Sequence, residues 1–123
     1  MEFDCRYIRE IHRVGNFFVM TQREYDRYIV EFPATFTGDG EGVAIVYNLG
    51  LGGCKIVTDR SLGVGTMLTM CLKVPKQTFV ITIRLATVRW TMPYEFGLEF
   101  LGMEELERNR LVQFLQGLET AAA

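Results

Sequence analysis

The sequence has one histidine, three cysteines and no long apolar run. His12 is the only histidine in 123 residues, so a Ser/His/Asp or Cys/His pair would depend on a side chain in the least regular part of the chain. Cys5, Cys54 and Cys71 form no CxxC pair and leave an odd thiol, which disfavours a zinc site and a disulfide framework. The glycines match no phosphate loop, because no Gly-Lys-Ser/Thr follows them. We therefore expect no catalytic residue, no metal site and no cofactor, and interpret the chain as a binding protein rather than an enzyme.

The sequence also lacks the signals of export, membrane insertion and polyanion binding. No apolar run approaches the roughly 18 residues that span a bilayer, and the N-terminus has no cationic head followed by an apolar stretch and a cleavage site. A formal net charge of -2 provides no overall attraction to nucleic acid or to anionic lipid. These absences predict a cytoplasmic protein that neither inserts into membranes nor binds a nucleic acid polymer.

What the sequence does contain is typical of one β-rich domain. Apolar residues make up 49% of the chain, and valine, isoleucine, phenylalanine, tyrosine, threonine and glycine are frequent. Six segments rich in β-branched and aromatic residues are predicted as strands: 28–36, 42–49, 54–58, 66–74, 78–90 and 95–101. Short strands joined by tight turns, with no helix between them, predict an all-β dominated fold, a six-stranded antiparallel barrel.

One predicted strand, 78–90, alternates over its whole length. The alternation places Phe79, Ile81, Ile83 and Leu85 on one face of the sheet. The only tryptophan, Trp90, stands at its end, and we expect this large ring to belong to the core rather than to a base-stacking platform.

After the strands the pattern changes to that of a helix. Apolar residues recur near a 3.6-residue period over about 103–118, and Glu104 and Glu105 suit a first helical turn. This helix should pack on the barrel and fray near Gly117. We divide the chain into an N-terminal extension, 1–20, and a barrel domain, 21–120. The extension is apolar enough to be ordered, and could cover a sheet edge or support a homo-oligomer.

Two motifs stand out around the first strands. Residues 23–27 read Arg-Glu-Tyr-Asp-Arg, an RxxxR stretch before the first strand, and residues 48–53 read Asn-Leu-Gly-Leu-Gly-Gly at the corner after the second. In this order and separation they resemble the PilZ domain, which is marked by RxxxR before a six-stranded barrel and by a later (D/N)xSxxG motif. The resemblance covers residues 21–118, including the closing helix.

The resemblance implies a receptor for the bacterial second messenger cyclic di-GMP, together with a protein partner that senses the bound state. Arg23 and Arg27 would bind the phosphates or the guanine edges, for which a guanidinium is suited. Asn48 would hydrogen-bond a guanine, and Gly53 would leave room for a base. Gly50 stands where the family motif has serine; one lost neutral hydrogen bond costs about 0.5 to 1.5 kcal/mol, which would weaken binding.

Three alternatives remain open at this stage. Gly50, and the absence of a further arginine at Gln22, favour a divergent barrel that binds no nucleotide and acts as a protein adaptor. Arg23 and Arg27 could instead pair with neighbouring acids at the surface. Small barrels also bind oligonucleotides without sequence specificity, although the charge balance here disfavours that function.

Overall fold

The computed structural model describes residues 11–14, 17–20 and 27–122, and the side chains of 27–119. Strands β1 (Ile11–Val14) and β2 (Phe17–Met20) pair antiparallel and form a small two-stranded sheet of their own. These two strands fall in the segment predicted as an ordered extension.

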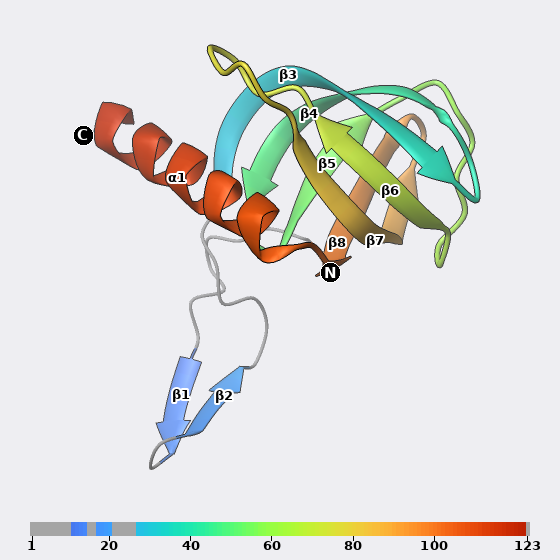
Figure 1. The fold of residues 1–123 in the computed structure, drawn as a ribbon. Helices are drawn as coiled ribbons and strands as arrows, with labels where there is room; N and C mark the ends of the chain where they lie inside the picture. The colour runs from blue at the N-terminus through green and yellow to red at the C-terminus, as the bar shows by residue number, and fades with distance from the viewer. Residues whose placement is uncertain (1–10, 15–16, 21–26, 123) are drawn as a thin grey trace.

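Six further strands close into an antiparallel barrel, which confirms the predicted fold (Figure 1). They are β3 (Arg27–Gly38), β4 (Gly42–Gly50), β5 (Gly53–Val57), β6 (Met67–Leu72), β7 (Ile81–Met92) and β8 (Glu95–Gly102). The order around the barrel is β3-β4-β5-β8-β7-β6, and β6 pairs with β3 to close it. Closure gives each of these six strands a paired neighbour on both sides.

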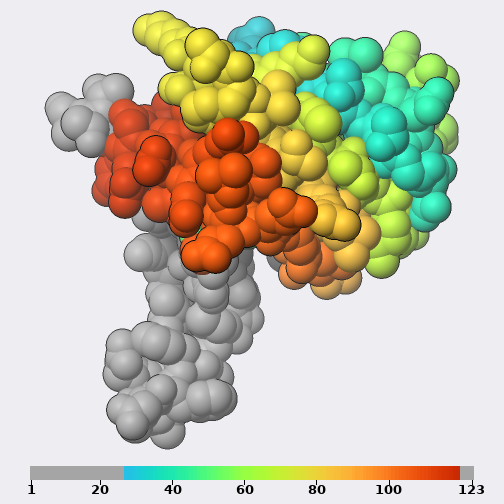
Figure 2. Space-filling view, viewed as in Figure 1, coloured from blue at the N-terminus to red at the C-terminus, as the bar shows by residue number. Residues whose placement is uncertain are grey.

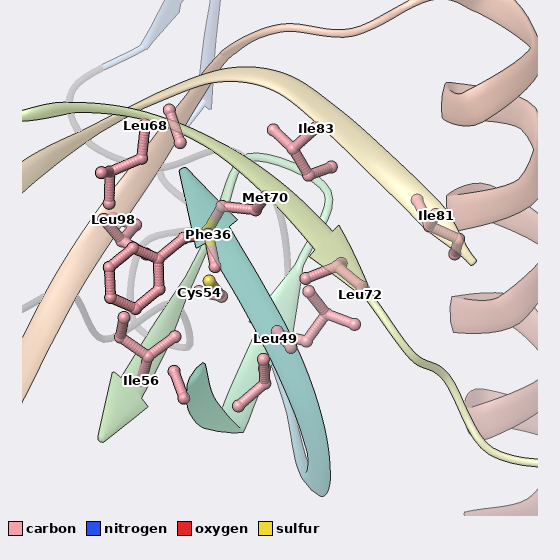
Figure 3. Packing of buried hydrophobic residues seen from close by; sticks show 14 of the residues in the cluster. Phe36, Leu49, Cys54, Ile56, Leu68, Met70, Leu72, Ile81, Ile83 and Leu98 are labelled. Atoms are coloured by element: carbon pink, nitrogen blue, oxygen red, sulfur yellow. The ribbon is translucent and has the colours of Figure 1, made fainter. Parts of the chain in front are cut away.

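The barrel interior is filled by one apolar cluster. Figure 3 shows Phe36, Leu49, Cys54, Ile56 and Met70 pointing inward from β3, β4, β5 and β6, and each is at most 1% exposed. These positions alternate with outward residues along their strands, as the period-two pattern predicts. Burial of this apolar surface is the main stabilising contribution to the fold.

The predicted strand 78–90 differs from β7 in its bounds and in its face. Lys76 has a left-handed backbone, with φ 63°, and pairing with β6 begins only at Ile81, so the strand starts there and runs on to Met92. In the pairing with β6, Arg84 and Leu85 together face Thr69, and this bulge in β7 leaves Leu85 40% exposed and Ala86 buried. Placing Leu85 on the same face as Ile83 was therefore wrong, because a bulge breaks the alternation.

Helix α1 (Glu105–Ala122) packs against the barrel as predicted, but it begins and ends later than 103–118. The Glu104 carbonyl accepts the Arg108 amide at 2.9 Å, which makes Glu104 the residue that precedes the first turn. Leu111 is fully buried against the barrel, and the Phe114 ring meets Phe32 edge to face at 6.0 Å. The helix continues through Gly117 to Ala122.

The helix also contacts the connection between β6 and β7. Figure 2 shows the red-orange helix against the yellow segment that follows β6, and the Arg110 guanidinium lies over the Phe79 ring at 4.6 Å. At the start of β7, Glu107 accepts the Thr82 amide at 2.9 Å. Helix and barrel therefore share both apolar and polar contacts.

Candidate ligand-binding site

A two-residue corner between β4 and β5 is where the second sequence motif lies. β4 ends at Gly50, β5 begins at Gly53, and only Leu51 and Gly52 connect them. The Gly52 carbonyl accepts the Phe100 amide at 2.9 Å, which ties the corner to β8. The predicted glycine corner is therefore present, and it is anchored to a third strand.

Arg27 begins β3 directly beside this corner. Its partner across the β3–β4 ladder is Gly50, and Asn48 is opposite Ile29, two rungs further along. Arg27 Nη1 donates a hydrogen bond to Asn48 Oδ1 at 3.0 Å. Because residues opposite each other in a ladder share a face, Gly50, which has no side chain, lies on the same face as Arg27.

Arg27 is also close to the barrel interior. It is only 5% exposed, and its charge acts on the thiol of Cys54. Burial raises the pKa of Cys54 to about 12, and Arg27 partly opposes that shift. A buried guanidinium is costly unless it is hydrogen-bonded, so Asn48 contributes to holding this charge in place.

Five residues form a continuous line across the outer face of the barrel. Ile29 pairs with Asn48, Asn48 with Lys55, Lys55 with Gly97, and Gly97 with Trp90. We call this line the outer row. Ile29 is 91% exposed, which shows that the row faces away from the core. The row starts beside the Arg27–Asn48 contact and continues over β5, β8 and β7.

Trp90 lies on the outer face and is half-buried, so its predicted place in the core was wrong. A Cβ at Gly97 would overlap the indole ring, and only glycine permits this close approach. The indole N–H is buried and has no hydrogen-bond partner among the described residues. The Lys55 ammonium lies over the indole at 5.8 Å from the ring centroid.

Sequence reasoning missed this Lys55–Trp90 contact. The available signal was Gly97, a glycine in the interior of a predicted strand, because such a glycine often marks a close approach by another group. Identifying that group required the register of three strands.

Carboxylates on β8 flank Gly97 and have partners of their own. Glu99 forms a charge-assisted hydrogen bond and ion pair with Arg89. Burial, and then the nearby Glu95 carboxylate, raise the pKa of Tyr47 to about 12. None of the ion pairs found between described residues involves Lys55.

The structure brings together four of the five residues predicted from the motifs. Arg27, Asn48, Gly50 and Gly53 meet where β3, β4 and β5 adjoin. Arg23 lies outside the described residues, so its role stays a prediction. Within the part of the chain that carries side chains, no group of three or more potential metal ligands is present.

An outer groove of about 560 Å³ lies near the other end of β4. Val43, Ile45, Val57 and Tyr94 line it, and none of the motif residues does. The groove is therefore distinct from the Arg27–Asn48 contact.

The described residues thus form a closed antiparallel barrel with a buried arginine beside a glycine corner. The chain belongs to the PilZ domain family, whose match covers residues 21–117. This confirms the resemblance inferred from the two motifs.

Solved structures support the same fold. The Bacillus subtilis inhibitor of motility (MotI/DgrA) superposes with a TM-score of 0.67 at 20% identity, over 85% of this chain and 55% of that protein. The PilZ domain of CeSA from a cellulose-synthesizing bacterium gives a TM-score of 0.59 at 11% identity, over 76% of this chain and 97% of that domain. The chain thus spans about half the length of the motility inhibitor. No curated protein gives a significant match.

No described helix is both long and apolar enough to cross a bilayer.

Proposed function

We propose that this domain binds cyclic di-GMP at the corner formed by Arg27, Asn48, Gly50 and Gly53, with Arg23 as the second arginine. The observation that carries the proposal is the Arg27–Asn48 hydrogen bond, because it joins the two family motifs in space. A guanidinium can bind a phosphate or the guanine O6 and N7 through two parallel hydrogen bonds. The Asn48 amide offers both a donor and an acceptor to a base edge.

Binding, not turnover, is the proposed activity, and the proposed location is the cytoplasm. Arg27 begins β3, so residues 21–26 lead directly into the site. A ligand that engages Arg23 and Arg27 together would fix this segment against the barrel. The altered surface would then engage or release a protein partner, which transmits the signal.

Isothermal titration calorimetry with cyclic di-GMP tests the proposal, with GTP and GMP as controls. We expect saturable heat with the cyclic dinucleotide alone, and at least about tenfold weaker binding by Arg27→Ala. Arg60→Ala is the matched control, because Arg60 contacts the β4 end at Gly42 rather than the end at Gly50. Wild-type affinity in Arg27→Ala would reject the site.

The second candidate is a protein adaptor that binds no nucleotide. Gly50 favours it, because the family motif has serine where this chain has no side chain beside Arg27. The Gly50→Ser variant distinguishes the two candidate functions. A weakened receptor should gain affinity for cyclic di-GMP, whereas an adaptor should show no binding before or after the change.

A further inference from the structure

Lys55 lies one strand beyond Asn48 on the outer face, and it is a cation placed to meet a ligand bound there. The two residues are direct ladder partners, and adjacent strands are about 4.8 Å apart. A ligand bound at Arg27 and Asn48 that extends over the barrel therefore reaches Lys55 next.

The Lys55 side chain is held at this place by Trp90. Both residues are ladder partners of Gly97 on β8, and the ammonium lies over the indole face at 5.8 Å. The missing side chain at Gly97 lets the indole lie flat across β8. The ring therefore positions a long, flexible cation without withdrawing its charge, because a ring face attracts a cation but does not neutralise it.

The neighbouring carboxylates on β8 form no ion pair with Lys55. Glu99 is paired with Arg89, and Glu95 lies near the Tyr47 hydroxyl, whose pKa it raises. Both acids that flank Gly97 on β8 therefore interact with residues other than Lys55. No ion pair found between described residues includes Lys55. The ammonium retains its capacity for an external anion.

We propose that Lys55 is a further ligand-binding residue, which contacts a phosphate of the bound dinucleotide from the side opposite Arg27. The inference rests on the proposed function. A ligand with two phosphodiester charges needs a cation at each end, and the outer row supplies one at β5 in addition to the arginine at β3. Lys55 thus offsets part of the positive charge that Gln22 does not provide.

Calorimetry on three variants tests the assignment. Lys55→Met should bind cyclic di-GMP roughly tenfold more weakly than wild type, and its affinity should depend less on salt, because one charge contact is lost. Lys55→Arg should stay within about threefold of wild type. Lys73→Met, which removes an exposed lysine on the β6–β7 connection, should bind as wild type.

The outcomes separate the two proposals. Wild-type affinity in Lys55→Met, with binding lost in Arg27→Ala, overturns the role of Lys55 and leaves the receptor function standing. Equal weakening in Lys55→Met and Lys55→Arg, with an unchanged salt dependence, shows a purely structural role and also overturns it. Absence of binding by the wild-type domain overturns both proposals.

The fluorescence of Trp90 supplies an independent test of the Lys55 assignment, because Trp90 is the only tryptophan. If Lys55 contacts the ligand, addition of cyclic di-GMP should change the indole fluorescence of the wild-type protein. The change should be much smaller in Lys55→Met. An identical change in both proteins would contradict the assignment.

Discussion

Arg27 Nη1 donates a hydrogen bond to Asn48 Oδ1 at 3.0 Å, although 21 residues separate the two in sequence. The bond crosses from the start of β3 to the last rungs of β4, and it satisfies part of a guanidinium that is 5% exposed. This single contact links the start of β3 to the end of β4 beside the glycine corner, and it has consequences for stability as well as for binding.

Asn48→Ala should destabilise the domain by about 1 to 3 kcal/mol, because a buried charged donor loses an acceptor. Asn48→Asp should recover most of that loss, since a carboxylate accepts the same hydrogen bond and adds an opposite charge. Urea unfolding at neutral pH measures both. Equal stability of Asn48→Ala and wild type would show that the bond contributes nothing to folding.

Gly97→Ala should displace the Trp90 ring, because the new methyl group would occupy the place of the indole. We expect a loss of about 1 to 3 kcal/mol and a red shift of tryptophan emission as the ring becomes more solvated. In a Trp90→Ala background the same Gly97→Ala change should cost much less. A purely additive double-mutant cycle would contradict the contact.

Thr58→Val should lower the free energy of unfolding by about 1 kcal/mol. Thr58 is 4% exposed, and its hydroxyl donates to the Val43 carbonyl at 2.8 Å, beyond the last β4–β5 ladder pair. Thr69→Val is the control, because its hydroxyl makes a similar bond to the Arg84 carbonyl at an exposed place. Denaturant unfolding should rank Thr58→Val as clearly the more harmful change.

Stability should fall in alkaline solution, in part through Cys54. Burial raises the pKa of this thiol from 9.0 to about 12, so between these values the unfolded chain loses a proton that the folded chain keeps. The slope for this group approaches about 1.4 kcal/mol per pH unit. Cys54→Ala should therefore show a constant cavity cost below pH 9 and a shrinking difference from wild type above it. A difference that is independent of pH up to 11 would refute the shifted pKa.

Tyr47 should contribute in the same direction at higher pH. Burial and the Glu95 carboxylate raise its pKa from 10.0 to about 12, so the folded state keeps the phenolic proton longer than the unfolded chain does. Tyr47→Phe should lose stability less steeply than wild type above pH 10. Spectrophotometric titration of tyrosine should show one fewer late-titrating phenol in the variant.

Much of the fold could be predicted because its signals are local. Period-two alternation and the turns at glycine and proline located all six barrel strands, and the 3.6-residue period located α1. The exceptions were caused by distant partners. Leu85 points outward because β7 has a bulge opposite β6, and no local pattern specifies which residue a partner strand will displace.

The candidate site also has one part that could be predicted from the sequence and one part that could not. Arg27, Asn48 and Gly53 were predicted from family motifs, which record spacing along the chain. The Lys55–Trp90 contact depends on the order β5-β8-β7 and on the register of each pair. That information is absent from any short window of sequence, so the contact required coordinates.

The pairing of β3 suggests how its first residues could move while the barrel stays closed. Residues 27–29 and 32–33 pair only with β4, with a register shift between Ile29 and Phe32, whereas residues 34–36 pair with both β4 and β6. The first part of β3 is thus held on one side and the middle on two. Amide hydrogen exchange should divide this one strand into two units, a fast-opening segment from Arg27 to Glu31 and a protected segment around Ala34. Local unfolding would then begin at the arginine and stop before the core.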